Sequence, residues 1–280
     1  MAALVLVTIV AWPSAADAGQ RRAGVAALQV ALRAHNLYGG TIDGIRGPGT
    51  RAGVMEFQRR KGLLADGVAG PRTRRALGRR GGPSIGKRII AAPARGWDVA
   101  ALQFALAWRG FPSGPFDGGF GERSRAALSR YQQWAGLTAD GVAGPATWRS
   151  VRRSAPRSKL RFARPSAAPI GDYFGPRGNS FHTGLDFTGG YNAPVRAAGR
   201  GCVTTASYVP GGYGRLVVIA HRAGMTSWYA HLNRILVRSG QCVRAGRRIG
   251  LIGSSGRSSG PHLHFELRLR DAVVNPLSGL

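Results

Sequence analysis

Side chains that could hold a metal ion are concentrated in the last third of the chain. His182 and Asp186 lie four positions apart, and His262 and His264 are separated by one residue. On a β-strand, His262 and His264 would point to the same face, because successive side chains alternate between the two faces. His231 lies between these two groups in the sequence. Two imidazoles, one carboxylate and an open position for water would make a hydrolytic zinc site.

The segment between His182 and Asp186 leaves two conformations open. On a helix, residues four positions apart share one face. Thr183 is β-branched and Gly184 is a poor helix former, which favours a loop or a bent strand in which the two side chains could still converge. Either pattern alone is more often explained by surface or core residues than by metal ligands. Their combination in a region with few other acidic groups favours a metal site.

The elements that must position these side chains are predicted to be short strands. From about Pro165 the chain consists of β-rich runs separated by glycines, which predicts a mainly antiparallel β domain of about 115 residues. The strands are expected at Val203–Thr205, Leu216–Ile219, Ser227–Tyr229 and Leu263–Leu269. The remaining histidines, His35 and His221, have no comparable partners and are interpreted as structural or solvated residues.

Three stretches of this region resemble the M23 family of zinc metallopeptidases, of the lysostaphin and LytM type. They are Phe181–Phe187, which contains His-Thr-Gly-Leu-Asp, Tyr229–Leu232, which reads Tyr-Ala-His-Leu, and Gly253–Glu266, which ends in Pro-His-Leu-His-Phe-Glu. The resemblance extends over roughly residues 170–269. It implies a β-rich metallopeptidase domain with Zn²⁺ as its cofactor.

By this resemblance the zinc ligands are His182, Asp186 and His264. His231 and His262 would then be the catalytic pair that polarises the attacking water and stabilises the transition state. A histidine titrates near neutral pH, so it can take up and return a proton during hydrolysis. Two histidines can divide the general-base and oxyanion-stabilising roles between them.

Glu266 is a second candidate for the general base. It shares a strand face with His264, and zinc peptidases of other families use a glutamate for this step. The resemblance to M23 assigns proton transfer to histidine instead, so Glu266 is expected to have a structural role near the metal. The glycine- and serine-rich segment Gly253–Gly260 could leave room for an extended peptide substrate, or it could be an ordinary hairpin turn.

The chain has only two cysteines, Cys202 and Cys242, and both fall in expected strand regions of this domain. In an exported protein such a pair favours a disulfide over two isolated buried thiols. The bond would close a loop of about 40 residues and stabilise the fold by a few kcal/mol.

The region before the β domain consists of a duplicated unit. Val25–Gln29 recurs as Val99–Gln103, and Ala65–Pro71 recurs as Ala139–Pro145, with the same offset of 74 residues and no gap. About 25 of 53 aligned positions are identical, which is far above chance. Two copies are too few for a solenoid, so we expect two independent small domains.

Each copy is predicted to be a bundle of three short helices. Leucines four positions apart mark the first helix, Asp-Gly turns separate the helices, and Thr50 or Ser124 is expected to cap the second helix. The order of these residues resembles the type 1 peptidoglycan-binding domain, which implies a module that binds the bacterial cell wall. The first copy carries the pattern at Leu28, Gln29, Asp43, Gly44, Gly47, Thr50, Phe57, Gln58, Asp66, Gly67, Gly70 and Thr73.

The chain is therefore predicted to be a multidomain protein. Two three-helix, all-α bundles at 24–79 and 97–152 precede the mainly antiparallel β metallopeptidase domain at 165–280. The segments 80–96 and 153–164 are rich in arginine, proline, serine and alanine, and they are predicted to be basic linkers.

The N-terminal segment 1–18 is expected to be a signal peptide. Met1–Trp12 is apolar, and Ala16 and Ala18 have the spacing of a signal-peptidase site. The apolar run is too short to span a bilayer as a helix, so no transmembrane span is expected in the mature protein. A buried N-terminal helix is the alternative. A signal peptide would place the protein in the cell envelope, in the periplasm or the cell wall, or outside the cell.

The net charge is strongly positive, with 40 lysines and arginines against 12 acidic residues, which gives +28. Such a charge favours polyanionic partners, including anionic polymers of the cell wall. The chain lacks an aromatic-plus-basic strand pattern and a recognition helix, so specific nucleic-acid binding is not expected. The function expected from the sequence is that of a secreted zinc endopeptidase that binds peptidoglycan and hydrolyses its peptides. The alternative is a catalytically inactive M23-like regulator that activates other cell-wall hydrolases.

Overall fold

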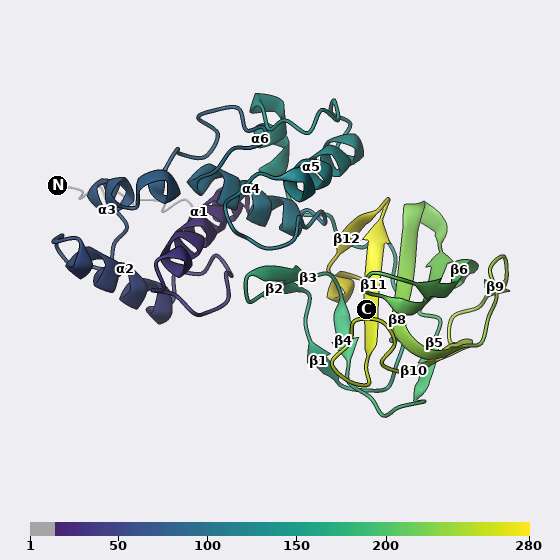
Figure 1. Cartoon of the computed structure of the whole chain (residues 1–280). Helices are drawn as coiled ribbons and strands as arrows, with labels where there is room; N and C mark the ends of the chain where they lie inside the picture. Colours follow the sequence, from purple (N-terminus) through teal and green to yellow (C-terminus); the bar gives the residue numbers. More distant parts are fainter. Residues whose placement is uncertain (1–14) are drawn as a thin grey trace, which may run out of the picture.

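The computed structural model describes residues 15–280 and shows a helical part followed by a β domain (Figure 1). A hairpin of two short strands, β2 (Gly175–Arg177) and β3 (Ser180–His182), lies between the helices and the large sheet. Most of the predicted signal peptide lies outside the described residues, and its last residues, 15–18, belong to the first helix. None of the helices in the described range is long and apolar enough to cross a membrane.

Within residues 15–280 the helical part contains six α-helices, three in each predicted module. The first module has α1 (Ala15–Ala34), α2 (Pro48–Arg60), α3 (Pro71–Ala76) and the short 3-10 helix η1 (Gly78–Gly81). The second module has α4 (Trp97–Trp108), α5 (Glu122–Trp134) and α6 (Pro145–Val151). This arrangement confirms the prediction of two three-helix units followed by a β domain.

The second helix of each module begins differently from the prediction. Gly47 and Gly121 are the N-cap residues of α2 and α5, and neither makes a side-chain capping bond. Thr50 and Ser124 lie inside the first turn and are buried. Each accepts a hydrogen bond of 3.2 Å from a glutamine amide of the first helix of its module. The predicted capping role is therefore wrong, because these hydroxyls face the core and not the helix end.

A buried glutamine organises each Asp-Gly turn of the helical part. Gln58 Oε1 accepts a hydrogen bond from the backbone N–H of Gly67 at 2.9 Å. Gln58 Nε2 donates to Asp66 Oδ1 at 2.8 Å and to Thr73 Oγ1 at 3.0 Å. Equivalent networks are centred on Gln29, Gln103 and Gln132. The polar residues of the repeated pattern therefore bind one another and hold the turns in place.

The two modules pack against each other through their first helices. The contact uses small side chains, including Ala27 and Ala31 of α1 and Ala100 and Ala107 of α4, and these residues belong to one shared apolar core. Small residues allow two helices to approach closely over their length. The modules form one helical body and not the two independent domains expected from the sequence.

The two segments predicted to be linkers are packed against the folded units. Ile90 is fully buried in the core of the second module, and its backbone pairs with Ala143 through bonds of 3.2 and 2.9 Å. Arg88 forms an ion pair of 2.7 Å with the buried Asp98. Phe162 is buried in the core of the β domain. Both segments carry positive charge, but apolar anchors hold them in defined positions.

The β domain is built from antiparallel strands. In addition to β2 and β3, they are β1 (Ile170–Asp172), β4 (Leu185–Phe187), β5 (Pro194–Arg196), β6 (Gly201–Val209), β7 (Gly214–Ala220), β8 (Met225–Ile235), β9 (Cys242–Val243), β10 (Arg248–Ile252), β11 (Leu263–Leu269) and β12 (Ala272–Val274), with 3-10 turns at Arg222–Gly224 and Pro276–Ser278. Within the described residues ten strands form one sheet with the main order β1-β4-β11-β8-β7-β6-β9. The remaining two pair as β2-β3. The four strands expected from the sequence lie in β6, β7, β8 and β11.

The central strands bury a continuous apolar core. Phe187, Tyr229 and Phe265 are fully buried, and the rings of Tyr229 and Phe265 are 5.3 Å apart. Cys202 of β6 and Cys242 of β9 lie directly opposite each other and form the predicted disulfide. The core supports the strands that carry the polar cluster described next.

Candidate metal centre

Two neighbouring strands and one hairpin bring the predicted ligands together. Asp186 of β4 is paired directly with His264 of β11, so the two side chains share one face of the sheet. His182 is the last residue of β3, and a bend that includes Gly184 connects it to β4. A Cβ atom on Gly184 would lie 2.3 Å from the backbone oxygen of Phe265, so the bend requires glycine there. Of the two conformations left open by the sequence, the bent strand is the one adopted.

Three ligand atoms of these residues converge. His182 Nε2 is 3.1 Å from Asp186 Oδ1 and 3.1 Å from His264 Nδ1. His264 Nδ1 is 2.8 Å from Asp186 Oδ1. Among the described residues, no other group of three His, Cys, Asp or Glu side chains converges in this way. The two histidines are buried and Asp186 is half-buried.

Each of the two histidines is oriented by a hydrogen bond from its other ring nitrogen. His182 Nδ1 donates to the backbone oxygen of Tyr173 at 2.8 Å. His264 Nε2 donates to Glu266 Oε1 at 3.0 Å. These bonds leave His182 Nε2 and His264 Nδ1 as the atoms whose lone pairs face Asp186. Metal-binding histidines are commonly held by such an outer acceptor, which sets the tautomer and the ring orientation.

The donor set fits a zinc ion. Zinc is bound by imidazole nitrogens and carboxylate oxygens at about 2.0–2.2 Å in a tetrahedron, whose ligand atoms are then about 3.3 Å apart. The three atoms here are 2.8, 3.1 and 3.1 Å apart, so a small outward movement of the side chains would accommodate the ion. Three protein ligands would leave a fourth position for water or substrate, as in catalytic zinc sites.

The close approach of these groups shifts their pKa values. Burial opposes the ionisation of Asp186, but hydrogen bonds to His182 and His264 hold the pKa of its carboxyl well below the usual range. Burial would lower the pKa of His264, but hydrogen bonds to Asp186 and Glu266 outweigh this effect and raise the pKa to about 9. A metal ion at His264 Nδ1 therefore competes with a proton for the same lone pair.

Glu266 is fully buried and anchored on several sides. Its carboxylate accepts hydrogen bonds from Thr183 Oγ1 at 2.5 Å, Tyr213 OH at 3.0 Å and Arg268 Nε at 2.8 Å, in addition to the bond from His264. Burial would raise the pKa of Glu266, but the positive charge of Arg268 and the bond from His264 lower it to about 2. The carboxylate is thus a permanently charged acceptor that orients His264, and its lone pairs are already occupied by these donors.

His231 and His262 lie next to the three ligands. The ring centroids of His231 and His262 are 4.7 Å apart, and those of His231 and His264 are 5.9 Å apart. His262 Nε2 is 3.8 Å from Asp186 Oδ1. The structure therefore brings all five residues singled out in the sequence to one place.

The tautomers of His231 and His262 follow from their backbone contacts. His231 Nδ1 donates to the backbone oxygen of Ser255 at 2.8 Å, and His262 Nδ1 donates to the backbone oxygen of Gly260 at 2.9 Å. Nε2 is then the atom of each ring that can accept a proton. Burial lowers the pKa of His231 below its usual value, which keeps this ring neutral at physiological pH and suits it to act as a base.

His231 occupies an unusual backbone position. Its φ angle is 60°, in the left-handed region that few residues other than glycine adopt. The pairing of β8 with β7 shifts register between Arg215 and Val217, so that β8 contains one extra residue at this point. Such a bulge turns a side chain away from the alternation of the strand and is frequent next to active sites. Nothing in the sequence indicated this bulge.

Arg177 and Asp172 are two further polar residues at the site that the sequence did not single out. Arg177 is 2.8 Å from Asp172 Oδ2 and 3.7 Å from Asp186 Oδ2. Asp172 Oδ2 is in turn 3.9 Å from His182 Nδ1. Arg177 is exposed and lies on β2, so its guanidinium is available to a substrate group near the cluster. The pairing of β1 with β4 places Asp172 opposite Asp186, and the pairing of β2 with β3 brings Arg177 to the ligands.

The turn of the β2-β3 hairpin is held by both helical modules. The backbone N–H of Ile42 donates to Gly178 O at 2.8 Å, and the backbone N–H of Phe116 donates to Asn179 O at 2.6 Å. Ile42 and Phe116 are equivalent positions, 74 residues apart, in the duplicated unit. The two copies therefore use the same backbone donor to bind consecutive carbonyls of the hairpin that ends in His182.

An aromatic cluster packs around the same hairpin. The ring of Trp108, at the end of α4, is 6.1 Å from that of Phe174 and 5.3 Å from that of Phe181. Phe174 and Phe181 are 5.0 Å apart in an edge-to-face arrangement. Phe181 thus belongs to the core of the helical body although it lies next to His182 in the sequence. The helical body and the metal centre share a structural element.

The two remaining histidines are not part of this group. His221 is hydrogen-bonded to Arg200 O at 2.8 Å and to Ser227 Oγ at 2.7 Å, within the β domain. His35 packs against Phe57 with ring centroids 5.1 Å apart. Both contacts are structural, in agreement with the interpretation from the sequence.

Comparison with protein families gives two matches. Residues 180–276 match the model described as peptidase family M23, and residues 21–77 and 95–151 match the model described as a putative peptidoglycan binding domain. The first match contains the four histidines and the one aspartate of the cluster. The second covers both copies of the duplicated unit.

Curated relatives are similar over the β domain. The chain is 45% identical over 97 residues to a DD-carboxypeptidase/endopeptidase, Mpg, of Neisseria meningitidis, and this match covers 35% of the chain and 22% of Mpg. It is 44% identical over 96 residues to the peptidoglycan DD-endopeptidase ShyA of Vibrio cholerae, covering 34% of the chain and 22% of ShyA. It is 38% identical over 128 residues to the murein hydrolase activator NlpD of Salmonella dublin, covering 46% of the chain and 33% of NlpD. The chain thus spans between about a fifth and a third of the length of these relatives.

The chain is 34% identical to a zinc-containing peptidase from Vibrio cholerae, with a TM-score of 0.38, and the match covers 43% of this chain and 39% of that one.

Proposed function

We propose that the chain is a zinc endopeptidase that hydrolyses peptide bonds in bacterial peptidoglycan. The premise is that the chain contains two domains of the putative peptidoglycan-binding family, followed by a domain of peptidase family M23. The observation that carries the proposal is the convergence of three ligand atoms with two further histidines beside them. The substrate class is supported by the relative that is named as a peptidoglycan DD-endopeptidase.

The residues of the cluster have distinct roles in the proposed reaction. His182, Asp186 and His264 would hold the zinc ion. When bound, zinc supplies Lewis acidity, which acidifies a water molecule and polarises the scissile carbonyl group. His231 Nε2 would take the proton of the attacking water and return it to the leaving amine. His262, whose ring lies beside that of His231, would stabilise the oxyanion that develops on the scissile carbonyl.

The helical modules would hold the enzyme on its substrate. The proposed modules, at 24–79 and 97–152, share one core, and both form hydrogen bonds with the hairpin that ends at His182. The modules therefore contact the hairpin that carries one of the proposed ligands, and binding to the wall would bring the metal centre close to its peptides. The positive charge of the chain adds attraction to anionic wall polymers.

We place the protein in the cell envelope or outside the cell. Peptidoglycan lies in this compartment, and disulfides such as that between Cys202 and Cys242 are typical of oxidising compartments. The apolar segment 1–18 would serve as the signal for export. N-terminal sequencing of the exported protein should give Gly19 as the first residue, whereas an N-terminus at Met1 would contradict the assignment.

The catalytic proposal is tested with purified protein and purified sacculi. We expect about one zinc ion per chain, and we expect mass spectrometry to detect released peptide fragments with new amino and carboxyl termini. Chelation should abolish the release, and added zinc should restore it, because hydrolysis depends on the Lewis acid. Protein that contains no zinc and releases no fragments, although it binds the sacculi, would contradict the proposal and favour a non-catalytic regulator.

A further inference from the structure

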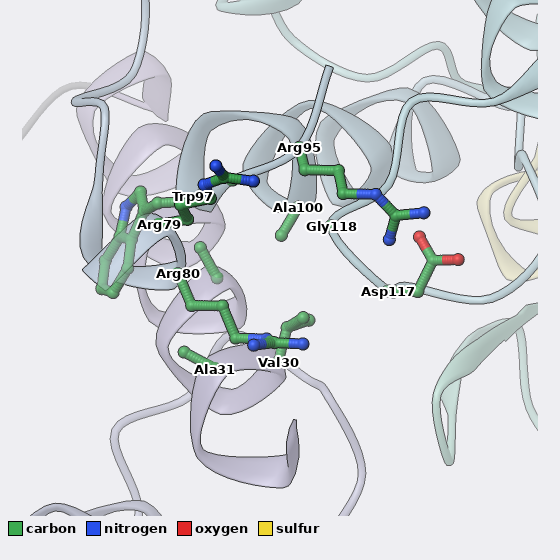
Figure 2. A pocket seen from close by; sticks show the side chains of 11 residues that line it. Val30, Ala31, Arg79, Arg80, Arg95, Trp97, Ala100, Asp117 and Gly118 are labelled. Atoms are coloured by element: carbon green, nitrogen blue, oxygen red, sulfur yellow. The ribbon is translucent and has the colours of Figure 1, made fainter. Parts of the chain in front are cut away.

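A pocket of about 200 Å³ lies where the two helical modules meet (Figure 2). It is bounded by α1 and η1 of the first module and by the start of α4 and the Asp117-Gly118 turn of the second. Neither module alone contains all of its walls. The lining residues that matter here are Val30, Arg79, Arg80, Arg95, Trp97 and Asp117.

The floor of the pocket is apolar and is built from small residues. It includes Ala31 of α1 and Ala100 of α4, which belong to the shared core of the two modules. A Cβ atom on Gly118, whose φ angle is +72°, would lie 3.2 Å from Gly96 O and 3.7 Å from Ala100 Cβ. The backbone of the second module therefore comes close to α4, which leaves a shallow surface of methyl groups and glycines.

Three arginines around this floor lack a protein acceptor. Within the described residues, the side chains of Arg79, Arg80 and Arg95 take part in none of the hydrogen bonds or ion pairs, whereas nearby Arg88 is paired with Asp98 and Arg74 donates to Gly81 O at 2.9 Å. Figure 2 shows the three guanidinium groups spread around the space in front of Ala100. Their charges are exposed and free to bind an anion.

The one carboxylate of the pocket is already engaged. Asp117 Oδ1 accepts hydrogen bonds from Gln103 Nε2 at 2.9 Å and from the backbone N–H of Gly119 at 2.8 Å, as part of a glutamine-centred network. Asp117 forms no ion pair with the arginines of the pocket in the described structure. The pocket therefore has an excess of positive charge above an apolar floor.

We propose that this pocket binds a short peptide with small side chains and a free carboxylate, which is the chemistry of the stem peptides of peptidoglycan; the inference rests on the proposed function. The planar guanidinium group forms paired hydrogen bonds with a carboxylate. The floor of alanine and glycine suits methyl side chains. The volume is below the 300–1,000 Å³ typical of pockets for larger ligands, so the pocket is too small to enclose a glycan strand.

The pocket forms only where the two copies of the duplicated unit meet. The first module and η1 supply Arg79 and Arg80, the second module supplies Trp97 and Asp117, and Arg95 lies in the segment that joins them. The packing of α1 on α4 joins both halves into one cationic site. The ligand would therefore contact both modules at once, and a change that separates the modules would remove the site.

The test compares two triple variants of the full chain that lose the same charge. The pocket variant is Arg79→Gln, Arg80→Gln and Arg95→Gln. The control variant is Arg72→Gln, Arg130→Gln and Arg149→Gln, at exposed arginines outside the pocket. The probe is acetyl-D-alanyl-D-alanine with a free carboxylate, its C-terminal amide serves as the uncharged analogue, and the dissociation constants are measured by NMR titration.

We expect the pocket variant to bind the free-carboxylate dipeptide at least tenfold more weakly than the unmodified chain, and the control variant to bind it within about twofold. The amide should bind the unmodified chain at least tenfold more weakly than the acid. Equal weakening in both variants, equal binding of acid and amide, or displacement of the dipeptide by equimolar inorganic phosphate would overturn the inference. Hydrolysis of a soluble cross-linked peptide by the unmodified chain tests the metal centre separately, so failure of the proposed function is distinguishable.

Discussion

The glutamine-centred networks of the helical modules and the histidine cluster of the β domain are both buried polar groups, but they differ in how their atoms are satisfied. Around Gln132, each polar atom faces a partner of the opposite kind: Oε1 accepts from Gly141 N at 2.9 Å, and Nε2 donates to Asp140 at 2.8 Å and Thr147 at 3.2 Å. In the histidine cluster, the lone pairs of His182 and Asp186 point at the same small space. A closed network holds a turn, whereas converging lone pairs are arranged for a cation or a proton.

The way in which polar atoms are satisfied distinguishes residues that hold the fold from residues that could bind a metal more reliably than residue type does. Gln and Asp, with a Thr in three networks and Ser124 in the fourth, recur in the modules with regular spacing, and the structure uses all of them to hold turns. The histidines of the cluster belong to no repeat and have irregular spacing in the sequence, but their side chains converge on one site.

Removal of a converging ligand should have the largest effect. We expect His264→Ala to reduce the hydrolysis of a soluble cross-linked peptide by about 1,000-fold or more and to abolish stoichiometric zinc binding, because the Lewis acid is lost. His35→Ala, at a histidine that packs on Phe57, is the control and should retain activity. Full activity in the His264 variant, with circular dichroism showing a folded chain, would disprove the ligand assignment.

Loss of the acceptor behind His264 should have a smaller effect. In Glu266→Gln the bond to His264 Nε2 becomes neutral and weaker, so we expect the affinity for zinc to fall by about 10–100-fold. The measurement is competition with a chelator of known affinity. Glu122→Gln, at an exposed carboxylate paired with Arg125, is the matched control. Unchanged zinc affinity in the Glu266 variant would show that this carboxylate only fills the core.

The pH dependence of hydrolysis should report His231. Burial lowers the pKa of this ring below 6.5, so its neutral form persists to lower pH than that of an exposed histidine. We therefore expect kcat/KM of a soluble substrate to stay flat from pH 8 to 6.5 and to fall about tenfold per pH unit below the pKa. An acidic limb centred above pH 7 would contradict the assignment of the base.

A closed network should affect stability without affecting chemistry. Gln132→Leu leaves the N–H of Gly141 and the carboxylate of Asp140 without their partner, so we expect the free energy of unfolding to fall by about 1–3 kcal/mol. Gln133→Leu changes the exposed neighbour and should have little effect. Denaturant unfolding measures both, and hydrolysis of a soluble peptide should be the same in both. A loss of hydrolysis in folded Gln132→Leu protein would break the distinction between the two kinds of cluster.

Local patterns in the sequence predicted much of the fold. The Asp-Gly turns, the leucines of the first helices and the four expected strands are all where the periodicity indicated, because these features depend on neighbouring residues. The capping roles of Thr50 and Ser124 were predicted wrongly. A hydroxyl near a helix start can bind the helix end or the core, and only the glutamine on another helix decides between them.

The sequence by itself determined the turns, the strands, the duplication and the list of residues able to bind a metal, since each is written in residue types and short spacings. The tertiary structure alone decided that ring nitrogens of His182 and His264, which are 82 positions apart in the sequence, lie close enough to bind one metal ion. The tertiary structure also decided that the bulge places His231 beside these ligands and that two equivalent backbone donors bind one hairpin. In addition, it decided that arginines from η1 and from the segment before α4 surround one pocket. Each of these depends on segments far apart in the chain, whose relative positions are set by the packing of the shared cores.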